Sequence, residues 1–450
     1  MPSIRDLFDN GSNDGKLGWG INARNAVLLL AALLLIRQVS VTIYNLHVHP
    51  LRGIPGPQLW IAFPFLRRYL MIRGTGEAKI RELHDRYGEV VRVEANEVYF
   101  LNPQAWKDIY GHGHAEFPKH EPEGLKMDPR KIVVANAKDH FRLRRAMLPA
   151  FSEKALSQQE PLIRAYVDLL IQRLQAVSDP VNSINIVRWY NLATFDLIAD
   201  LAFGESLQGL RTGRSNAWID SIVQMFAIWP MFEAVGALGH VGSLIVLLLS
   251  PLIRHGERRH TANAAKMANG RLNARKQPDR GDFMDYFLRS RGQAHSLSDD
   301  EIIANSGLLM VAGSETSASL LSGLTYWLLK TPDALRRVTR EVREAFGSEE
   351  EMTFVETRAR LPYLSACMEE GLRMYPPVPF ATLRRVPENT PMEVCGIMLP
   401  PKVSHIPNHT MDGKHAGPAG RKVRLTKLGR RESASITSPR VHPRSTSTDR

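Results

Sequence analysis

Cysteine is nearly absent from this sequence, which has two in 450 residues, Cys367 and Cys395. Two cysteines exclude a disulfide framework and a four-cysteine metal site. No stretch has the spacing of a zinc site or of a glycine-rich loop that binds phosphate. The sequence therefore excludes small disulfide-stabilised proteins and offers no zinc or phosphate motif.

Positive charge is concentrated at one end of the chain. The net charge is +12, and residues 411–450 hold ten Lys or Arg and three Asp or Glu, a balance of +7, which leaves +5 for residues 1–410. This tail has no aromatic residue and is rich in Ser, Thr, Pro and Arg, a composition typical of disorder. We therefore expect a disordered basic tail, 411–450, and no nucleic-acid partner.

An apolar segment lies near the N-terminus. Residues 26–36 are all apolar, and apolar character resumes after Arg37 as far as residue 46. With 21 residues, the segment 26–46 is long enough to span a bilayer. A polar N-terminus, 1–25, precedes it, and a Pro/Gly-rich hinge, 50–57, follows. The pattern predicts a membrane anchor, with a buried N-terminal helix as the alternative.

A helix of about thirty residues is predicted to begin after Ser298, which forms a capping box with Glu301. Glu315 is the one charged residue in the interior of this segment. The centre, residues 312–316, is poorly suited to a purely structural helix. A glycine there costs about 1 kcal/mol relative to alanine, and a buried carboxylate needs a partner or a use. A core helix with an incidental Glu and a transmembrane helix are the alternatives.

Other segments have simpler patterns. Residues 89–101 alternate as a β-hairpin does, and residues 111–136 are rich in His, Pro, Gly and charge, as long loops are. Residues 225–253 are apolar and are either core or a pair of helices whose junction contacts a membrane. Residues 254–280 are basic and predict an exposed helix. Pro332 and Pro362 each predict the start of a helix.

Three short motifs and their order resemble those of the cytochrome P450 haem-thiolate monooxygenases. The motifs are Ala-Gly-Ser-Glu-Thr-Ser at 312–317, Glu370-x-x-Arg373, and Tyr-Pro-Pro-Val-Pro at 375–379. His140-x-x-x-Arg144 stands upstream, and residues 190–205 are similar to the fungal membrane-bound branch. The resemblance covers roughly residues 50–410.

The resemblance implies a mainly α fold with small β-sheets, an N-terminal membrane anchor helix and a catalytic domain over 58–410. It implies a haem-dependent monooxygenase that hydroxylates a lipophilic small molecule in secondary metabolism. Oxygen and two electrons would be consumed, and NADPH would supply the electrons through NADPH–cytochrome P450 reductase. The implied location is the endoplasmic reticulum membrane, with a single anchor and a cytoplasmic body.

The resemblance also assigns roles to residues of the central helix. It implies that this helix passes over the face of the haem where oxygen binds. Gly313, beside Ala312, would make room for oxygen. Glu315 and Thr316 would deliver protons to it.

Five more residues receive roles by the same resemblance. Glu370 and Arg373 would form a buried structural ion pair that folds the haem pocket. His140, Arg144 and Arg384 would bind the haem propionates. These side chains would fix the cofactor without taking part in the chemistry.

The sequence departs from the family at the axial iron ligand. The family uses a cysteine thiolate in a Phe-x-x-Gly-x-Arg-x-Cys-x-Gly loop. Neither Cys367, on the predicted helix of Glu370, nor Cys395, in a short predicted strand, has this setting. No metal ligand is therefore identified. A reading-frame shift or an unspliced intron near residue 410 would produce such a sequence.

Two further interpretations stay open at this point. One is a catalytically inactive family member that acts as a membrane-associated helical protein. The other is a transporter-like protein with spans at 26–46, 225–253 and 302–329.

Overall fold

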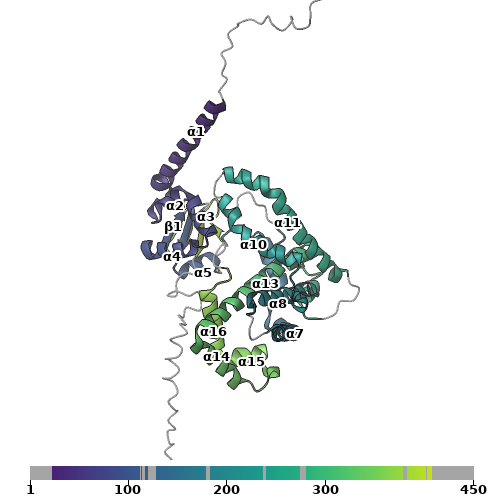
Figure 1. Ribbon diagram of the computed structural model, residues 1–450. Coiled ribbons are helices and arrows are strands. Elements are labelled where there is room, and N and C mark those ends of the chain that lie inside the picture. Colours follow the sequence, from purple (N-terminus) through teal and green to yellow (C-terminus); the bar gives the residue numbers. More distant parts are fainter. Residues whose placement is uncertain are drawn as a thin grey trace, which may run out of the picture.

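The computed structural model describes residues 23–407, except residues 112, 114–116, 120–127, 179–182, 237–239, 274–279, 379–382 and 402. Helices dominate this part of the chain, as predicted, and the strands form two small sheets (Figure 1). The predicted tail, 411–450, and most of the polar N-terminus lie outside the described residues.

The elements have the following bounds. The first helices are α1 (Ala23–Ile43), α2 (Gln58–Ala62), α3 (Pro64–Ile72), α4 (Gly76–Tyr87), α5 (Gln104–Tyr110) and α6 (Ala137–Met147). Next come α7 (Glu153–Val177), α8 (Ile186–Phe203), α9 (Gly209–Thr212), α10 (Ala217–Gly236), α11 (His240–Leu272) and α12 (Phe283–Arg289). The last are α13 (Asp299–Lys330), α14 (Pro332–Ala345), α15 (Phe354–Arg360) and α16 (Pro362–Met374). The strands are β1 (Val90–Glu94), β2 (Glu97–Phe100), β3 (Arg384–Arg385), β4 (Met392–Val394), β5 (Ile397–Leu399) and β6 (Ser404–Pro407).

Helix α1 projects from the body as a single rod (Figure 1). Among the described residues, Leu28–Val48, which contains most of α1, is the one stretch long and apolar enough to cross a membrane, and its 18-residue apolar window holds no buried residue. At its C-terminal end the Gln38 side chain donates to the Ala62 carbonyl oxygen at 2.9 Å. The alternative of a buried N-terminal helix is therefore wrong.

The segment predicted as a hinge, 50–57, is fixed to the larger sheet. Leu51 is buried, and the Pro55 carbonyl oxygen accepts a hydrogen bond from the Arg92 backbone N–H at 2.8 Å. Gly56 passes so close that a Cβ there would lie 1.9 Å from the Arg92 carbonyl oxygen. This contact fits a stiff connection between α1 and the body, because the segment is bonded to β1.

The larger sheet has the strand order β1-β2-β6-β3. β1 and β2 form the predicted antiparallel hairpin, with Val91 opposite Tyr99. β6 runs parallel to β2 and antiparallel to β3, so strands from distant parts of the chain meet here. Phe100 and Phe117 are fully buried beside this sheet. The sheet thus fixes the N-terminal part of the body to its C-terminal part.

Helix α13 runs through the centre of the body (Figure 1). Ser298 accepts from the Glu301 backbone N–H while the Glu301 side chain accepts from Ser298, so the predicted capping box is present. The helix packs on α8, α11 and α16, and its first half joins a core that contains Phe195 and Met310. The prediction of one long central helix is confirmed.

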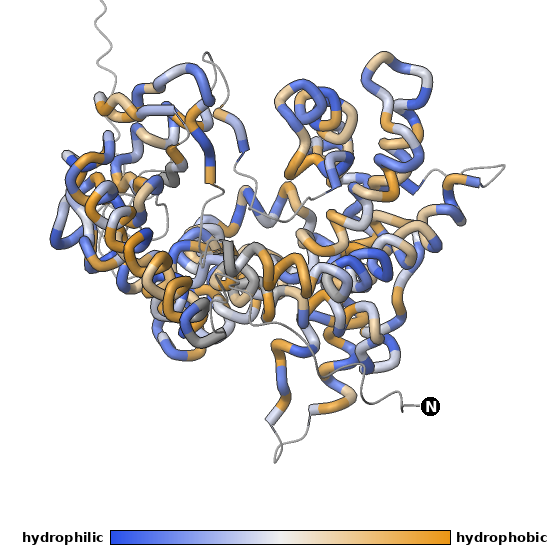
Figure 2. Tube along the Cα trace, turned by 90° about the horizontal axis from the view of Figure 1, so that it is seen from above, coloured by the Kyte–Doolittle hydropathy of each residue, from blue (hydrophilic) through white to orange (hydrophobic). Residues whose placement is uncertain are grey.

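The apolar block 225–253 forms parts of α10 and α11, so its described residues belong to two helices, and Val246 among them is buried. The predicted junction between the helices, 237–239, lies outside the described residues. Exposed apolar side chains are found on both helices, and Figure 2 shows hydrophobic segments at the periphery of the body as well as in its centre. These side chains are Met225, Ile228, Met231, Leu244, Leu247 and Leu248. Arg271, near the end of α11, is buried against Asp282 at 2.7 Å, which corrects the prediction that the whole basic segment is exposed.

A substitution at Gly56 tests the attachment of residues 50–57. We expect Gly56→Ala to lower the free energy of unfolding by about 2–3 kcal/mol, because the clash is with backbone that cannot rotate away. Gly53→Ala is the matched control, since a Cβ at Gly53 meets nothing within 4 Å. Urea unfolding of the detergent-solubilised chain measures both. Equal effects of the two substitutions would show that the segment is free.

Candidate functional site

The centre of α13 presents Ala312 and Thr316 on one face. The two residues are four apart and lie one turn apart on the helix. Ala312 is exposed and Thr316 is half-buried. The Thr316 hydroxyl donates to the Ala312 carbonyl oxygen at 2.6 Å. The hydroxyl proton is thus held within the helix, and the lone pairs of the oxygen are left to accept.

Glu315 lies next to this face without a partner for one of its oxygens. Among the buried side-chain atoms of the described residues, Glu315 Oε1 is the one carboxylate oxygen that makes no hydrogen bond. Burial raises the pKa of Glu315 because the charged form loses water without gaining a counter-ion. Glu315 and Thr316, the expected acid–alcohol pair, are neighbours in sequence. The Thr316 hydroxyl, however, donates its hydrogen bond to the Ala312 carbonyl oxygen and not to Glu315.

Gly313 faces a neighbouring helix. A Cβ at this position would lie 2.7 Å from Ile198 Cδ1 of α8. The missing side chain therefore permits the close approach of α8 and α13, a packing role that the sequence analysis did not predict. The expectation that Gly313 makes room for oxygen gains no support from this contact, because the free space is taken by Ile198.

Glu370 and Arg373 form the expected ion pair on α16. Arg373 Nε and Nη2 donate to the two Glu370 carboxylate oxygens at 2.8 and 2.7 Å. The Glu370 side chain is 8% exposed and that of Arg373 is 29% exposed. Two parallel bonds fix both planes, so the pair stiffens the last turn of the helix.

The three predicted propionate donors are on two elements. His140 and Arg144 are four apart on α6, whose N-terminus is capped by the Asn136 side chain. They therefore share one face of the helix, and Arg144 is exposed. Arg384, on β3, donates from Nη1 to the Phe117 carbonyl oxygen at 3.1 Å. His140 and Arg144 therefore lie on one face of α6, and Arg384 fixes the backbone at Phe117.

Neither cysteine fits the role of axial iron ligand. Cys367 is fully buried within α16, and burial raises the pKa of its thiol to about 11. Cys395 lies in the tight turn between β4 and β5, and burial raises the pKa of its thiol to about 11 as well. Iron in a haem-thiolate site requires a thiolate. Neither cysteine among the described residues therefore lies in a loop like the one that carries the family's axial ligand.

Comparison with known proteins identifies the family. The sequence profile described as Cytochrome P450 matches residues 55–411. The chain belongs to the cytochrome P450 family. Members of this family are haem-dependent monooxygenases, so this P450 is an oxidoreductase. Its curated fungal relatives belong to secondary metabolism, which makes this chain a P450 of that type.

Three fungal relatives define that type. A trichothecene C-4 hydroxylase from Trichoderma arundinaceum is 43% identical over 84% of this chain and 75% of its own length. The cytochrome P450 monooxygenase olcB from Penicillium canescens is 39% identical over 84% of this chain and 76% of its own length. The versicolorin B desaturase stcL from Emericella nidulans is 36% identical over 81% of this chain and 75% of its own length.

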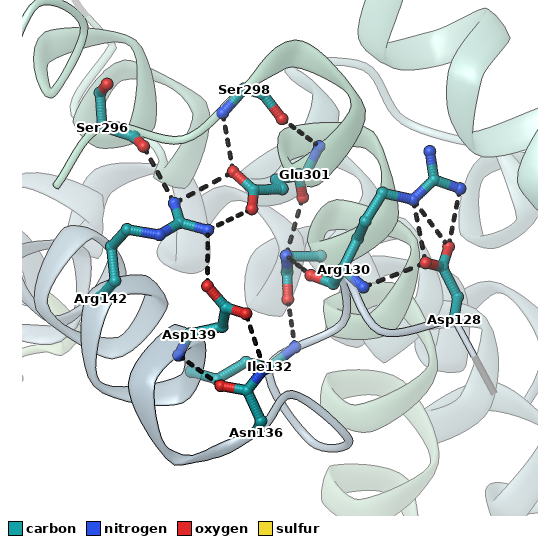
Figure 3. A network of polar contacts seen from close by, with 10 residues as sticks. Asp128, Arg130, Ile132, Asn136, Asp139, Arg142, Ser296, Ser298 and Glu301 are labelled. Atoms are coloured by element: carbon teal, nitrogen blue, oxygen red, sulfur yellow. Dashed lines mark hydrogen bonds and ion pairs between the residues drawn. The ribbon is translucent and has the colours of Figure 1, made fainter.

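The sequence analysis missed a polar network at the start of α13 in this P450. Figure 3 shows Arg142 of α6 paired with Glu301, next to contacts that involve Arg130 and Ile132. Asn305, a lone amide in the apolar part of α13, lies in this network with no exposed surface. Its position seven residues before Ala312, on the same helical face, was the signal that could have revealed it.

The packing role of Gly313 is open to a direct test. We expect Gly313→Ala to lower the free energy of unfolding by about 1–3 kcal/mol through the clash with Ile198. Ile198→Val removes the Cδ1 atom, so the double variant should recover part of that loss. Chemical unfolding of the four proteins in this cycle gives the coupling. Purely additive effects would contradict the contact.

The raised pKa of Glu315 predicts a pH-dependent stability. An acid whose pKa is higher in the folded state destabilises that state as the pH rises through the unfolded and then the folded pKa. We therefore expect Glu315→Gln to be more stable than the parent at about pH 8, with the gain shrinking towards about pH 4. Thermal unfolding across this range measures it, with Glu369→Gln, an exposed carboxylate on α16, as control. A pH-independent difference would contradict burial of the carboxyl group.

Proposed function

We propose that this P450 hydroxylates a lipophilic small molecule of fungal secondary metabolism. A substrate C–H bond, O2, NADPH and a proton give an alcohol, water and NADP⁺, and NADPH–cytochrome P450 reductase transfers the two electrons. The observation that carries this proposal is the centre of α13 in a P450 chain, where half-buried Glu315, whose Oε1 is buried without a hydrogen bond, adjoins the face of Ala312 and Thr316. The hydroxylase and desaturase names among the relatives support oxidation at carbon.

Glu315 and Thr316 divide the handling of protons in this proposal. Glu315 holds its proton to a higher pH than an exposed glutamate because burial raises its pKa. Thr316 offers a hydroxyl oxygen on the neighbouring face as an acceptor, because its O–H donates to the Ala312 carbonyl oxygen. A general acid works best when its pKa lies near the working pH. The burial of Glu315 moves its pKa in that direction.

Edge contacts would place the cofactor. The family implies haem, and its propionates would meet His140 and Arg144 of α6, with Arg384 as a further donor. Because Arg144 is exposed, its guanidinium can reach an anionic group without first breaking out of the core. Haem, when bound, supplies the activation of oxygen.

The membrane is the proposed setting. Helix α1 would anchor the chain in the endoplasmic reticulum, with the body on the cytoplasmic side. Helices α3 and α10 pack together and both expose apolar side chains. On α3 these are Phe65, Tyr69 and Ile72. Contact with lipid would remove these apolar side chains from water and so stabilise the bound state. An apolar surface beside a membrane favours a lipophilic substrate such as a terpenoid, a polyketide or a fatty acid.

One observation favours a second candidate function. Cys367 is fully buried within α16, and Cys395 lies in the tight turn between β4 and β5, so neither has the loop setting of the family's iron ligand. A chain of this kind would be a catalytically inactive family member that acts as a membrane-associated helical protein. The two candidates differ in whether the chain forms a thiolate-ligated haem.

Product formation under labelled oxygen separates the candidates. The full chain is expressed in yeast microsomes with NADPH–cytochrome P450 reductase and given terpenoid, polyketide and fatty-acid substrates under ¹⁸O2. We expect a product that contains one ¹⁸O atom. Thr316→Val should lower product per NADPH by about 10- to 100-fold. Thr339→Val is the matched control, because the Thr339 hydroxyl on α14, away from the candidate site, makes the same bond to a carbonyl four residues back.

If no labelled product forms, the carbon monoxide difference spectrum of the same microsomes shows whether the chain binds haem through a thiolate. No labelled product together with no thiolate-type Soret shift would overturn the monooxygenase proposal and support the inactive member. A thiolate-type shift without product would show that the substrate class is wrong.

A further inference from the structure

A buried asparagine fixes the end of the predicted loop to α13. Asn305 Oδ1 accepts from the Ile132 backbone N–H at 2.9 Å, and Nδ2 donates to the Arg130 carbonyl oxygen at 2.9 Å. Nδ2 also donates to the Glu301 carbonyl oxygen at 2.8 Å. Both amide protons and the amide oxygen are therefore used. Asn305 has no exposed surface, so these bonds are shielded from water.

Ion pairs surround this amide but are more exposed. They are Arg142–Glu301, Arg130–Asp300 at 3.1 Å and Lys131–Glu257 at 3.2 Å. Arg130 and Asp300 are 43% and 72% exposed, so water and salt weaken their attraction. Figure 3 shows how Arg142 on α6 and the segment around Arg130 approach the first turns of α13. Asn305 is the shielded centre of the attachment.

Asn305 shares a helical face with the candidate site. At 100° per residue, positions 312 and 316 each lie about 20° from position 305 around the axis, on opposite sides of it, so the three span about 40°. Asn305 precedes Ala312 by two turns, which is about 10 Å along the helix. The segment held by Asn305 therefore covers the same face that Ala312 and Thr316 leave open further along. Its position sets where the open part of this face begins.

The same segment leads directly into α6. Asn136 caps this helix, and Arg142 fixes it to Glu301 through two donors, one at 3.2 Å. His140 and Arg144 lie on the far side of α6 from Arg142, since they are two residues away in each direction. A shift of residues 128–136 would therefore move the start of α6 together with both predicted edge donors.

We propose that Asn305 is a positioning residue for the reaction. By holding Arg130 and Ile132 on α13, it sets the end wall of the face at Ala312 and Thr316 and the placement of α6. Its function is to fix a position and not to contact the reacting atoms. The proposal rests on the proposed function, because that function makes this face the place of the substrate.

Tryptic cleavage within the segment reads the attachment directly, because Arg130 and Lys131 are themselves cleavage sites. We expect Asn305→Ala to speed native-state cleavage after these two residues by about 10- to 100-fold, since three buried hydrogen bonds are lost. Cleavage after Arg358, which is 84% exposed and lies on α15, should not change. Mass spectrometry of the released peptides separates the sites.

A distance measurement tests position apart from stability. Spin labels are placed at Val133→Cys, in the segment, and Lys330→Cys, at the far end of α13, in a Cys395→Ser background. Val133 is 51% exposed, so a label fits there. Double electron–electron resonance should give one narrow distance in the parent and a broad or shifted distribution in Asn305→Ala. A residue that only stabilised the fold would leave this distribution narrow in the folded protein.

Ser306→Ala is the matched control, because Ser306 is equally buried and its hydroxyl makes no hydrogen bond in the described residues. We expect less than a twofold change in cleavage and the parental distance. If Asn305→Ala does not fold, the same two measurements are made on Asn305→Asp. This variant keeps the acceptor for the Ile132 N–H and loses both donors. Parental cleavage and distance in the folded Asn305 variant would overturn the proposal. These readouts need no turnover, so a failed monooxygenase assay leaves them interpretable.

Discussion

The structure depends on a conflict within α13, which has to be buried along much of its length and yet present polar groups on one face. Burial is achieved by close approach of other helices. Ile198 of α8 occupies the space that Gly313 leaves, and Tyr375 closes on Gly323 in the same way. A larger residue at either glycine would separate the helices, so the small residues are a condition of the packing.

The polar groups of this helix are satisfied in different ways. Ser314 and Thr316 donate to carbonyl oxygens four residues back, at 2.7 and 2.6 Å. Asn305 uses its amide on the segment that precedes α6. Glu315 differs, since one of its oxygens is buried without a partner. An unsatisfied buried group destabilises a fold, and such groups are retained where function requires them.

Local features of the fold were predictable and distant contacts were not. The capping box at Ser298, the helix starts at Pro332 and Pro362, and the hairpin near residue 95 follow from residues close together in sequence. The contact of Gly313 with Ile198 joins positions more than a hundred residues apart, and no local pattern encodes it. The bond of Pro55 to β1 is equally invisible to local patterns, because Arg92 lies 37 residues further along the chain. Of the candidate site, the ion pair of Glu370 was predictable, since its partner is one turn away.

Burial acts on the acidic groups of this P450 according to whether a cation lies beside them. Arg373 faces Glu370 with two bonds, so the charged carboxylate is compensated. Glu315 has no such bond to the oxygen that is buried, and burial raises its pKa. The same effect raises the pKa values of Cys367 and Cys395 to about 11 and keeps both as thiols. A thiolate needs a cation, a metal or several N–H donors to exist at neutral pH. Burial in the described interior therefore favours the protonated forms of Glu315, Cys367 and Cys395.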